Sequence, residues 1–208
     1  MYIAIEGVIG VGKTTLARLL KPIFEAELLL EVFEENPFLA DFYGDRERYA
    51  FQTQIFFLLS RYHQQRALES ALKPDTNLLA DYTFKKDALF ADINLQGDEL
   101  DTYNEVHNAL AEKIPLPDLI VYLRASTDVL MQRIAHRDRP YERDMERGYI
   151  ESVNQAYEKF FNQTYDGPPI LIIDTDVLDY IANQKDLKWV EERIRQTLKM
   201  SPLQAELL

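Results

Sequence analysis

The chain has 208 residues, of which 47% are hydrophobic and 28% charged, values that suit one globular domain with a sizeable core. Its formal net charge of -12 argues against general affinity for nucleic acid or anionic membrane, although a local site for a small anion stays possible. The absence of cysteine excludes disulfides, thiolate catalysis and cysteine-based zinc sites. The first residues lack the basic region of a secretory signal, and no apolar run reaches membrane-spanning length, so we expect a cytoplasmic protein.

Short apolar strands alternate with helical segments along the chain. Strands are predicted, in chain order, at 2–6, 28–32, 77–81, 119–124 and 169–174. Helices are predicted at 13–25, in a short turn of 36–43, over most of 45–72, through 82–113, from 127 into an arginine cluster, over 147–163 and over 187–199. This alternation predicts an α/β fold with a five-stranded parallel sheet covered by helices on both faces. Residues 201–208 are expected to be loose or to pack on a partner.

The stretch GVIGVGKT fits the phosphate-binding pattern G-x-x-x-x-G-K-[ST] and lies between a predicted strand and a predicted helix, as the pattern requires. Glycines let successive N–H groups point at phosphate oxygens, and the helix N-terminus adds partial positive charge. Lys13 is expected to reach the β- and γ-phosphates, and the Thr14 hydroxyl to hold Mg²⁺. Nucleotide contacts are predicted from this loop and the following turn, at Gly7, Gly10, Val11, Gly12, Lys13, Thr14 and Thr15. The sequence therefore predicts a P-loop nucleotide-binding protein.

Three arginines, Arg133, Arg137 and Arg139, lie close together after the fourth strand and its helix. Taken alone, such a cluster could simply complement the negative end of a helix dipole. The chain has no N/T-K-x-D motif of the kind that GTPases use to read their base, and it is small for a motor ATPase. In a small P-loop protein the arginines are typical of the lid of a nucleoside or nucleotide kinase. With Lys13 and Mg²⁺ they are expected to neutralise charge on the phosphoryl group in the transition state.

At this point the chain resembles the deoxynucleoside kinase family, especially its small bacterial purine members, over nearly its whole length. The family's lid, R-x-x-x-R-x-R followed by an acidic residue, is present as RIAHRDRPYE. The resemblance implies that Glu142, with Tyr43 of DFYGD, binds the 3′-hydroxyl of the sugar. It also implies that Glu31 is the general base for the attacking 5′-hydroxyl. Glu34 and Glu35 are alternatives, but a position at the end of a strand favours Glu31.

The long predicted helix resembles the family's base-reading helix. Gln54 lies eleven residues after Tyr43, which matches the family spacing and implies a hydrogen bond to the edge of the base. Arg61, two turns onward, is implied in the same pocket. Asp87, six residues beyond Asp81, matches the family's base-contacting acid. An amide, a guanidinium and a carboxylate can together satisfy the mixed donors and acceptors of a purine, guanine or adenine.

One departure from the family pattern follows the third strand, where the family generally has D/E-R-S and this chain reads ADYTF. Asp81 is still expected beside Mg²⁺, whereas Tyr82 replaces the arginine that helps to position the acceptor. Some bacterial deoxyguanosine kinases resemble this chain in having tyrosine there, which favours deoxyguanosine. The stretch 171–180, LIIDTDVLDY, resembles the loop that packs on the adenine of the donor, although a plain strand-to-helix loop would read the same way.

The sequence thus predicts one kinase domain over 1–208, with a lid at about 133–147, that uses ATP and Mg²⁺ to phosphorylate a purine deoxynucleoside. A thymidylate kinase is one alternative, but it needs a cation for the phosphate of its acceptor and has no use for a carboxylate at Glu31. A non-catalytic nucleotide-binding relative is the other; Tyr82 favours it, whereas the P-loop, Asp81 and the arginines do not. The resemblance also implies a homodimer packed helix to helix.

Overall fold

The computed structural model describes residues 1–71 and 76–200. Within them, five strands form one parallel sheet in the order β2-β3-β1-β4-β5. The strands are β1 (Tyr2–Glu6), β2 (Ala26–Leu29), β3 (Asn77–Ala80), β4 (Leu119–Arg124) and β5 (Ile170–Asp174). The predicted five-stranded parallel α/β fold is therefore confirmed. The predictions for 201–208 fall outside the described residues.

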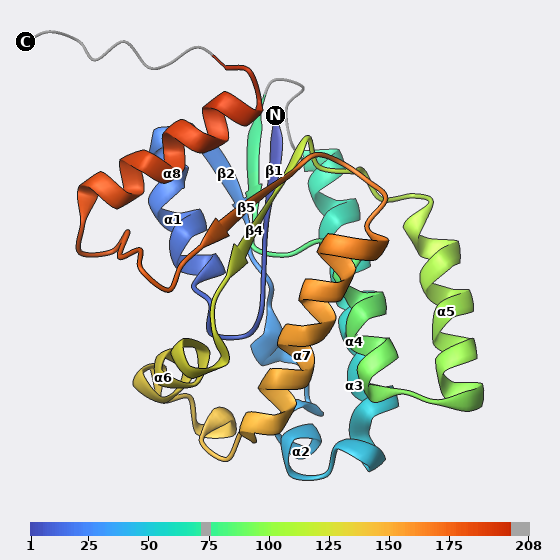
Figure 1. Cartoon of the computed structure of the whole chain (residues 1–208). Helices are drawn as coiled ribbons and strands as arrows, with labels where there is room; N and C mark the ends of the chain where they lie inside the picture. The colour runs from blue at the N-terminus through green and yellow to red at the C-terminus, as the bar shows by residue number, and fades with distance from the viewer. Residues whose placement is uncertain (72–75, 201–208) are drawn as a thin grey trace, which may run out of the picture.

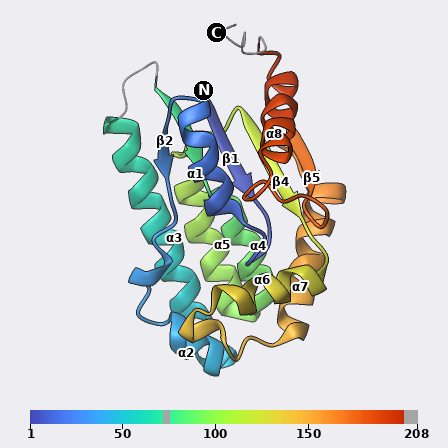
Figure 2. The ribbon, with the colours of Figure 1, turned by 90° about the vertical axis from the view of Figure 1, so that its left-hand side faces the viewer.

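Helices cover both faces of the sheet (Figure 1). The helices α1 (Lys13–Ile23) and α8 (Gln184–Thr197) lie on one face, which Figure 2 turns toward the viewer. The opposite face is covered by α3 (Arg46–Ala71), α4 (Lys86–Asn94), α5 (Gly97–Ala111) and α7 (Arg147–Lys159). Two further helices, α2 (Leu39–Gly44) and α6 (Thr127–Arg137), lie below the sheet in Figure 1. None of the helices in 1–71 and 76–200 is long and apolar enough to cross a membrane.

The core lies between the sheet and these helices, which explains why the strands were readable from sequence. All of 119–123 in β4 is buried, as are Ile3, Ala4 and Ile5 of β1. A strand buried on both faces has no polar side and reads as a continuous apolar run rather than an alternating one.

The prediction for the second strand was wrong by two residues at its start and three at its end. Leu29 is its last paired residue, opposite Ala80 of β3. Glu31 has already left the ladder, because its backbone N–H donates to the Asp81 side chain (Oδ1, 2.8 Å) instead of to a strand neighbour. The apolar run continues past the strand because Leu30 still packs against the core.

Several other predicted boundaries also moved. The first helix ends at Ile23, and Glu25 takes a left-handed conformation with φ 48° before β2. The helix predicted over 147–163 is α7 followed by a π-helical turn over Phe160–Thr164. The parallel strands all end at the lower edge in Figure 1, so the loops after β1, β2, β3 and β4 meet there. A ligand site at this edge is the usual arrangement in open α/β sheets.

Candidate active site

The loop after β1 folds as a compact phosphate cradle. Gly10 and Gly12 have φ of 87° and 104°, and a Cβ at Gly12 would lie 2.5 Å from the Tyr180 hydroxyl. Only glycine tolerates both conditions. The Lys13 ammonium donates to the carbonyl oxygens of Gly7 (2.7 Å) and Val8 (3.2 Å), so it lies folded over the loop. Burial, more than any other influence, lowers the pKa of Lys13 to about 8.

A carboxylate at the end of β3 joins the P-loop to the segment after β2. The Thr14 hydroxyl at the start of α1 donates to Asp81 Oδ2, and Asp81 Oδ1 accepts the backbone N–H of Glu31. A hydroxyl and a carboxylate are the hard oxygen ligands that Mg²⁺ prefers, with phosphate and water completing its shell. Within the described part of the chain no group of three metal-ligating side chains exists, so Thr14 and Asp81 fit a nucleotide-bound ion rather than a protein cage.

Glu31 is held by two cations. Arg61 Nε donates to Oε1 (2.9 Å), and the Lys86 ammonium lies 3.1 Å from Oε2. Arg61 pairs at the same time with Asp87 of α4, and the two side chains are only 5% and 1% exposed. Burial favours the protonated acid, but the charges of Arg61 and Lys86 outweigh it and hold the pKa of Glu31 well below its usual range. Glu31 is therefore an anchored, ionised carboxylate.

Tyr82 stands where the resemblance implies an arginine, and its hydroxyl hydrogen-bonds to α3 rather than to this carboxylate. Its hydroxyl donates to Gln64 Oε1 on α3 (3.1 Å), and its ring lies 5.7 Å from the guanidinium carbon of Arg61. Tyr82 does not line the pocket described below. It therefore supports Arg61 from outside the pocket.

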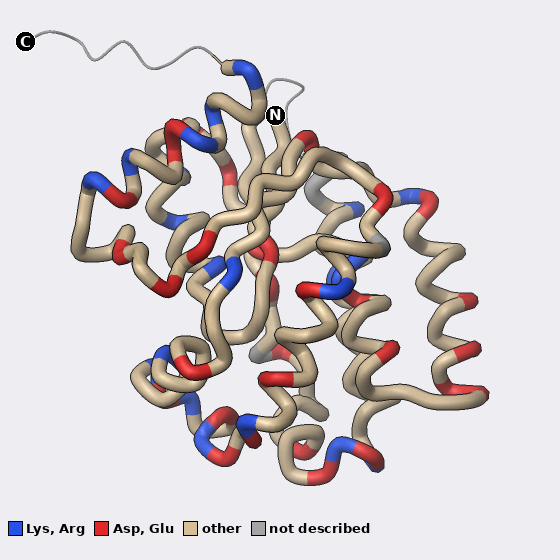
Figure 3. Tube along the Cα trace, viewed as in Figure 1, with Lys and Arg blue, Asp and Glu red and all other residues tan. Residues whose placement is uncertain are grey.

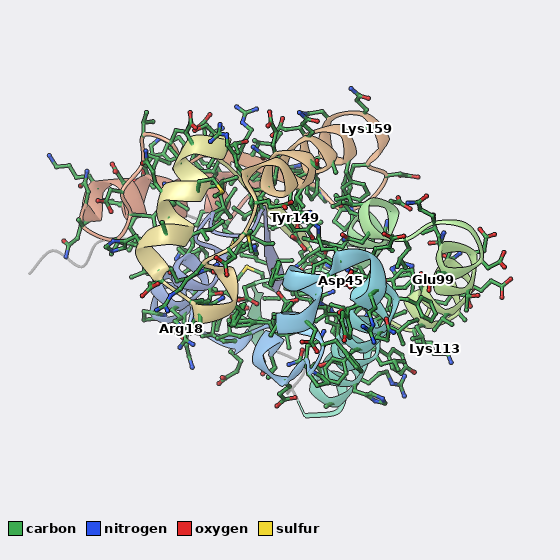
Figure 4. The ribbon with its side chains drawn as sticks, turned by 90° about the horizontal axis from the view of Figure 1, so that it is seen from below. Arg18, Asp45, Glu99, Lys113, Tyr149 and Lys159 are labelled. Atoms are coloured by element: carbon green, nitrogen blue, oxygen red, sulfur yellow. The ribbon has the colours of Figure 1, made fainter. Side chains whose placement is uncertain are left out.

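One pocket at the carboxyl edge of the sheet contains most of the residues predicted from sequence. The predicted residues among its lining are Gly10, Lys13, Thr14, Glu31, Tyr43, Gln54, Arg61, Asp81, Arg137, Arg139 and Glu142. Asp87 lies behind Arg61, and Arg133 lies at the base of the lid; neither lines the pocket. Sequence reasoning missed several further lining residues, which are Phe33, Phe57, Lys86, Phe90, Tyr141 and Tyr149. Figure 4, seen from below, shows Tyr149 near the middle, whereas Glu99 and Lys113 lie out on the side of α5.

The part of the pocket nearest α3 combines apolar walls with a few buried polar groups. Gln54 and Arg61 lie seven residues apart, which places them on one face of α3, and both are 4% exposed. The ring of Phe57 lies 4.8 Å from the guanidinium carbon of Arg61, and Phe90 of α4 also lines the pocket. Flat apolar surfaces with a few oriented polar groups are the usual lining of a site for an aromatic ligand such as a nucleobase.

Across the pocket lie Glu142 and Tyr43, which both line it. Glu142 is 4% exposed and accepts from Arg137 Nε (3.0 Å). The ring of Tyr43 stacks on that of Tyr141, with centroids 6.2 Å apart and planes 8° from parallel. Burial first, and then the charges of Tyr149 and Glu142, raise the pKa of the Tyr43 hydroxyl, which is thus a hydrogen-bond donor at neutral pH. A neutral donor and an ionisable acceptor side by side can bind one hydroxyl group.

Each of the three lid arginines already contacts another group of the protein. Arg133 donates to the hydroxyl (2.9 Å) and the carbonyl (2.7 Å) of Thr175 after β5. Arg137 pairs with Glu142, and Arg139 places its guanidinium 4.1 Å from the ring centre of Phe33. The chain reverses direction between them at the C-cap of α6, Asp138, which has φ 51°. Basic and acidic residues are interspersed along this segment (Figure 3), and its five arginines are nearly balanced by four carboxylates.

The loop between β5 and α8 lies against the P-loop. The Tyr180 hydroxyl contacts the carbonyl oxygen of Val11 (3.4 Å), and Thr175 Oγ1 donates to the carbonyl of Arg124 (3.1 Å). Val177 in the same loop is 87% exposed. The placement agrees with a loop beside the donor nucleotide, and its contact with adenine stays a prediction.

The sheet order, the P-loop after β1 and an arginine-bearing lid after β4 define the class of P-loop phosphotransferases. Within that class the chain belongs to the deoxynucleoside kinase family, whose family model, described as deoxynucleoside kinase, matches residues 3–199.

Individual relatives agree with this assignment. The chain is 34% identical to a deoxyguanosine kinase of Bacillus subtilis (strain 168), over 95% of this chain and 97% of that one. It is 33% identical to a deoxyadenosine kinase of Dictyostelium discoideum, over 83% and 71% of the two chains. A solved structure of deoxyadenosine kinase from M. mycoides with bound dATP superposes with a TM-score of 0.81 at 28% identity, covering 94% of this chain and 99% of that one. These relatives are named for different purines. They therefore support membership of the family, but they do not single out one base.

Proposed function

We propose that the protein transfers the γ-phosphoryl group of ATP to the 5′-hydroxyl of a purine deoxynucleoside, with deoxyguanosine preferred over deoxyadenosine. The observation that carries the proposal is that one pocket combines a P-loop lysine, an anchored carboxylate at Glu31 and a buried Gln54–Arg61 pair. A phosphate end and a base end therefore lie on either side of a group suited to accept a proton. The 34% identity to a deoxyguanosine kinase supports guanine as the base.

At the phosphate end, the P-loop amides and Lys13 bind the β- and γ-phosphates of ATP. Thr14 and Asp81 are the ligands that would hold Mg²⁺, which neutralises charge on the phosphate oxygens when bound. Arg137 and Arg139 line the same pocket and add positive charge around the transferred group, while Arg133 anchors the lid to the loop after β5. Catalysis here is positioning and charge neutralisation, because the phosphoryl transition state needs little covalent chemistry from the protein.

Glu31 receives the proton of the attacking 5′-hydroxyl. An ionised carboxylate accepts a hydrogen bond from that hydroxyl and orients its oxygen toward the γ-phosphorus. The proton moves as the O–P bond forms, since the hydroxyl becomes strongly acidic only at that stage. A nucleotide kinase would instead need a cation here for the phosphate of its acceptor, so the site favours a nucleoside over thymidine monophosphate.

The base and sugar are bound by the remaining lining residues. The Gln54 amide faces the base edge, with Arg61 and, behind it, Asp87 completing the polar set. Tyr43 and Glu142 bind the 3′-hydroxyl. The homodimer, the cytoplasmic location and the preference for ATP as donor stay predictions that rest on the resemblance and on composition.

The test is a coupled ADP-release assay with ATP, Mg²⁺ and a panel of acceptors. The panel contains deoxyguanosine, deoxyadenosine, deoxycytidine, thymidine, thymidine monophosphate and the matching ribonucleosides. We expect the highest kcat/KM for deoxyguanosine, with deoxyadenosine second. Turnover of thymidine monophosphate alone would refute the role of Glu31, and a preference for deoxyadenosine would refute the assignment of the base.

A single variant separates an enzyme from a protein that only binds nucleotide. Glu31→Gln keeps the shape of the side chain and removes its charge, so we expect kcat to fall by about 100-fold or more. The affinity for ATP, measured by isothermal titration calorimetry, is expected to change little. A Glu31→Gln variant with the kcat of the parent would contradict the catalytic role of this carboxylate.

A further inference from the structure

Lys86 is a buried lysine in an environment that does not favour a lysine. It is 7% exposed and is the first residue of α4, where the helix already carries partial positive charge. Burying an ammonium group costs further free energy unless an anion compensates it. A lysine at this position therefore does not stabilise α4. The reason for its burial has to be the anion with which it pairs.

That partner is the carboxylate proposed to receive the proton. The Lys86 ammonium lies 3.1 Å from Glu31 Oε2, while Arg61 donates to the other oxygen, Oε1. The two cations come from different helices, α4 and α3. A carboxylate held at both oxygens from two directions is fixed in position and in the rotation of its plane, which is what orienting a hydroxyl requires.

The two cations are not equivalent. Arg61 divides its charge between Glu31 and Asp87, whereas Glu31 is the ion-pair partner recorded for Lys86 among the described residues. Lys86 also lines the pocket, between Glu31 and the ring of Phe90, 5.6 Å from its ammonium. Removing Lys86 therefore frees one oxygen of Glu31 and leaves the Arg61–Asp87 pair in place.

We propose that Lys86 is the positioning residue for phosphoryl transfer, holding Glu31 Oε2 so that the carboxylate meets the 5′-hydroxyl of the acceptor. The inference rests on the proposed function of Glu31 and assigns to α4 a part in the chemistry besides carrying Asp87. It also accounts for a tyrosine at 82, since Glu31 already has a cation on each oxygen.

The experiment measures kcat, the KM for the deoxynucleoside and the Kd for ATP in Lys86→Met, which keeps the length of the side chain without its charge. We expect kcat to fall about 100-fold, the loss typical of a misplaced reacting group, while KM and Kd stay within about threefold of the parent. Lys86→Arg restores a cation and is expected to recover most of kcat. A purely structural lysine would not produce this split between kcat and binding.

The neighbouring lysine supplies a matched control. Lys85 turns away from the pocket and donates to the carbonyl oxygen of Asp166 (2.8 Å). Lys85→Met removes the same charge one residue away, and its kcat is expected to equal that of the parent.

The outcomes separate the two proposals. An unmodified protein that phosphorylates no nucleoside refutes the proposed function, whatever Lys86 does. If the parent is active, two results overturn the role of Lys86 and leave the proposed function standing. One is an unchanged kcat in Lys86→Met, and the other is a loss of kcat that Lys86→Arg does not restore. If Lys86→Met does not fold, Lys86→Gln takes its place, with the same split expected.

Discussion

At the scale of single residues, Arg61 connects two buried carboxylates that would otherwise repel each other. It pairs with Glu31 and with Asp87, and its side chain is 5% exposed. We expect Arg61→Met to reduce the free energy of unfolding by about 3 kcal/mol, because buried Asp87 loses its cation and Glu31 is left with Lys86 alone. The measurement is urea unfolding followed by circular dichroism.

A second substitution makes this prediction specific to charge. Adding Asp87→Asn to Arg61→Met removes the carboxylate that lost its cation and should recover part of the lost stability. Arg18→Met, at an exposed position on α1, serves as the control and is expected within about 0.5 kcal/mol of the parent. If Arg61→Met proved as stable as Arg18→Met, the buried network would contribute nothing to folding.

The hydroxyl of Tyr43 gives a prediction about substrate recognition. Tyr43 stacks on Tyr141 beside Glu142, so Tyr43→Phe should keep the stack and lose only the hydrogen bond proposed to the 3′-hydroxyl. We expect kcat/KM for deoxyguanosine to fall about tenfold, the effect of one neutral hydrogen bond. For 2′,3′-dideoxyguanosine, which lacks that hydroxyl, parent and variant should be equal. Equal losses on both substrates would show that Tyr43 acts on something else.

At the scale of elements, α5 packs on the loop after β3 through a buried imidazole. His107 stacks on Phe84, with centroids 5.0 Å apart, and its Nε2 lies 3.3 Å from the Phe84 carbonyl oxygen. Burial lowers the pKa of His107 below its usual value. The unfolded chain therefore binds a proton at His107 more readily than the folded one, and folding loses stability as the pH falls below about 6.5.

The corresponding measurement is the urea midpoint of the parent and of His107→Gln at about pH 7.5 and about pH 5.5. We expect the parent to lose more stability than His107→Gln over this interval. His63, exposed on α3, is the control, and His63→Gln should follow the parent. Parallel curves for the parent and His107→Gln would mean that another group dominates this interval.

The elements were predictable where burial alone decides them. The strand at 119–124 was predicted to the residue, because both of its faces are covered and every buried position is apolar. The end of β2 was not predictable, because the apolar run continues to Leu30, past the last paired residue, before Asp81 captures the backbone of Glu31. The boundary is determined by the side chain of Asp81, which follows β3, and the hydrophobic pattern of residues 28–32 contains no information about that contact.

The site divides in the same way. Lys13 and Thr14 belong to a local motif whose spacing placed them, whereas the lid arginines needed the context of a small P-loop protein and the family resemblance. Lys86 belongs to no motif; a lysine next to Lys85 at the start of a helix reads as a solvated end. The one signal for Lys86 in the sequence was its position directly before Asp87, a predicted site residue. In the structure both side chains are buried at the start of α4.

At the scale of the whole molecule, Glu6 joins three parts of the fold beneath the P-loop. It is fully buried, and its carboxylate accepts from the backbone N–H of Gly7 (3.2 Å), the hydroxyl of Thr83 (2.8 Å) and the hydroxyl of Tyr157 on α7 (3.2 Å). Glu6→Gln turns one acceptor into a donor that faces donors, so we expect a loss of about 2 kcal/mol in the free energy of unfolding.

Urea unfolding measures this loss, and calorimetric titration shows whether ATP affinity falls with it, as expected for a support of the P-loop. Glu27→Gln is the control, because Glu27 is 61% exposed at the surface of β2 and forms only a surface pair with Lys21. If Glu6→Gln and Glu27→Gln were equally stable, Glu6 would not contribute to the stability of the fold.

The engagement of all three lid arginines has a consequence for selectivity in a cell crowded with phosphorylated metabolites. Arg133 and Arg137 already bind groups of the protein, and Arg139 rests on Phe33. A phosphate or sulfate ion that binds the arginines must first break these contacts. Its net binding free energy is therefore only the difference between the contacts it forms and those it replaces. A nucleotide is expected to engage the P-loop as well, and those further contacts favour its displacing the built-in ones. We therefore expect the resting lid to bind small anions more weakly than a bare cluster of arginines would.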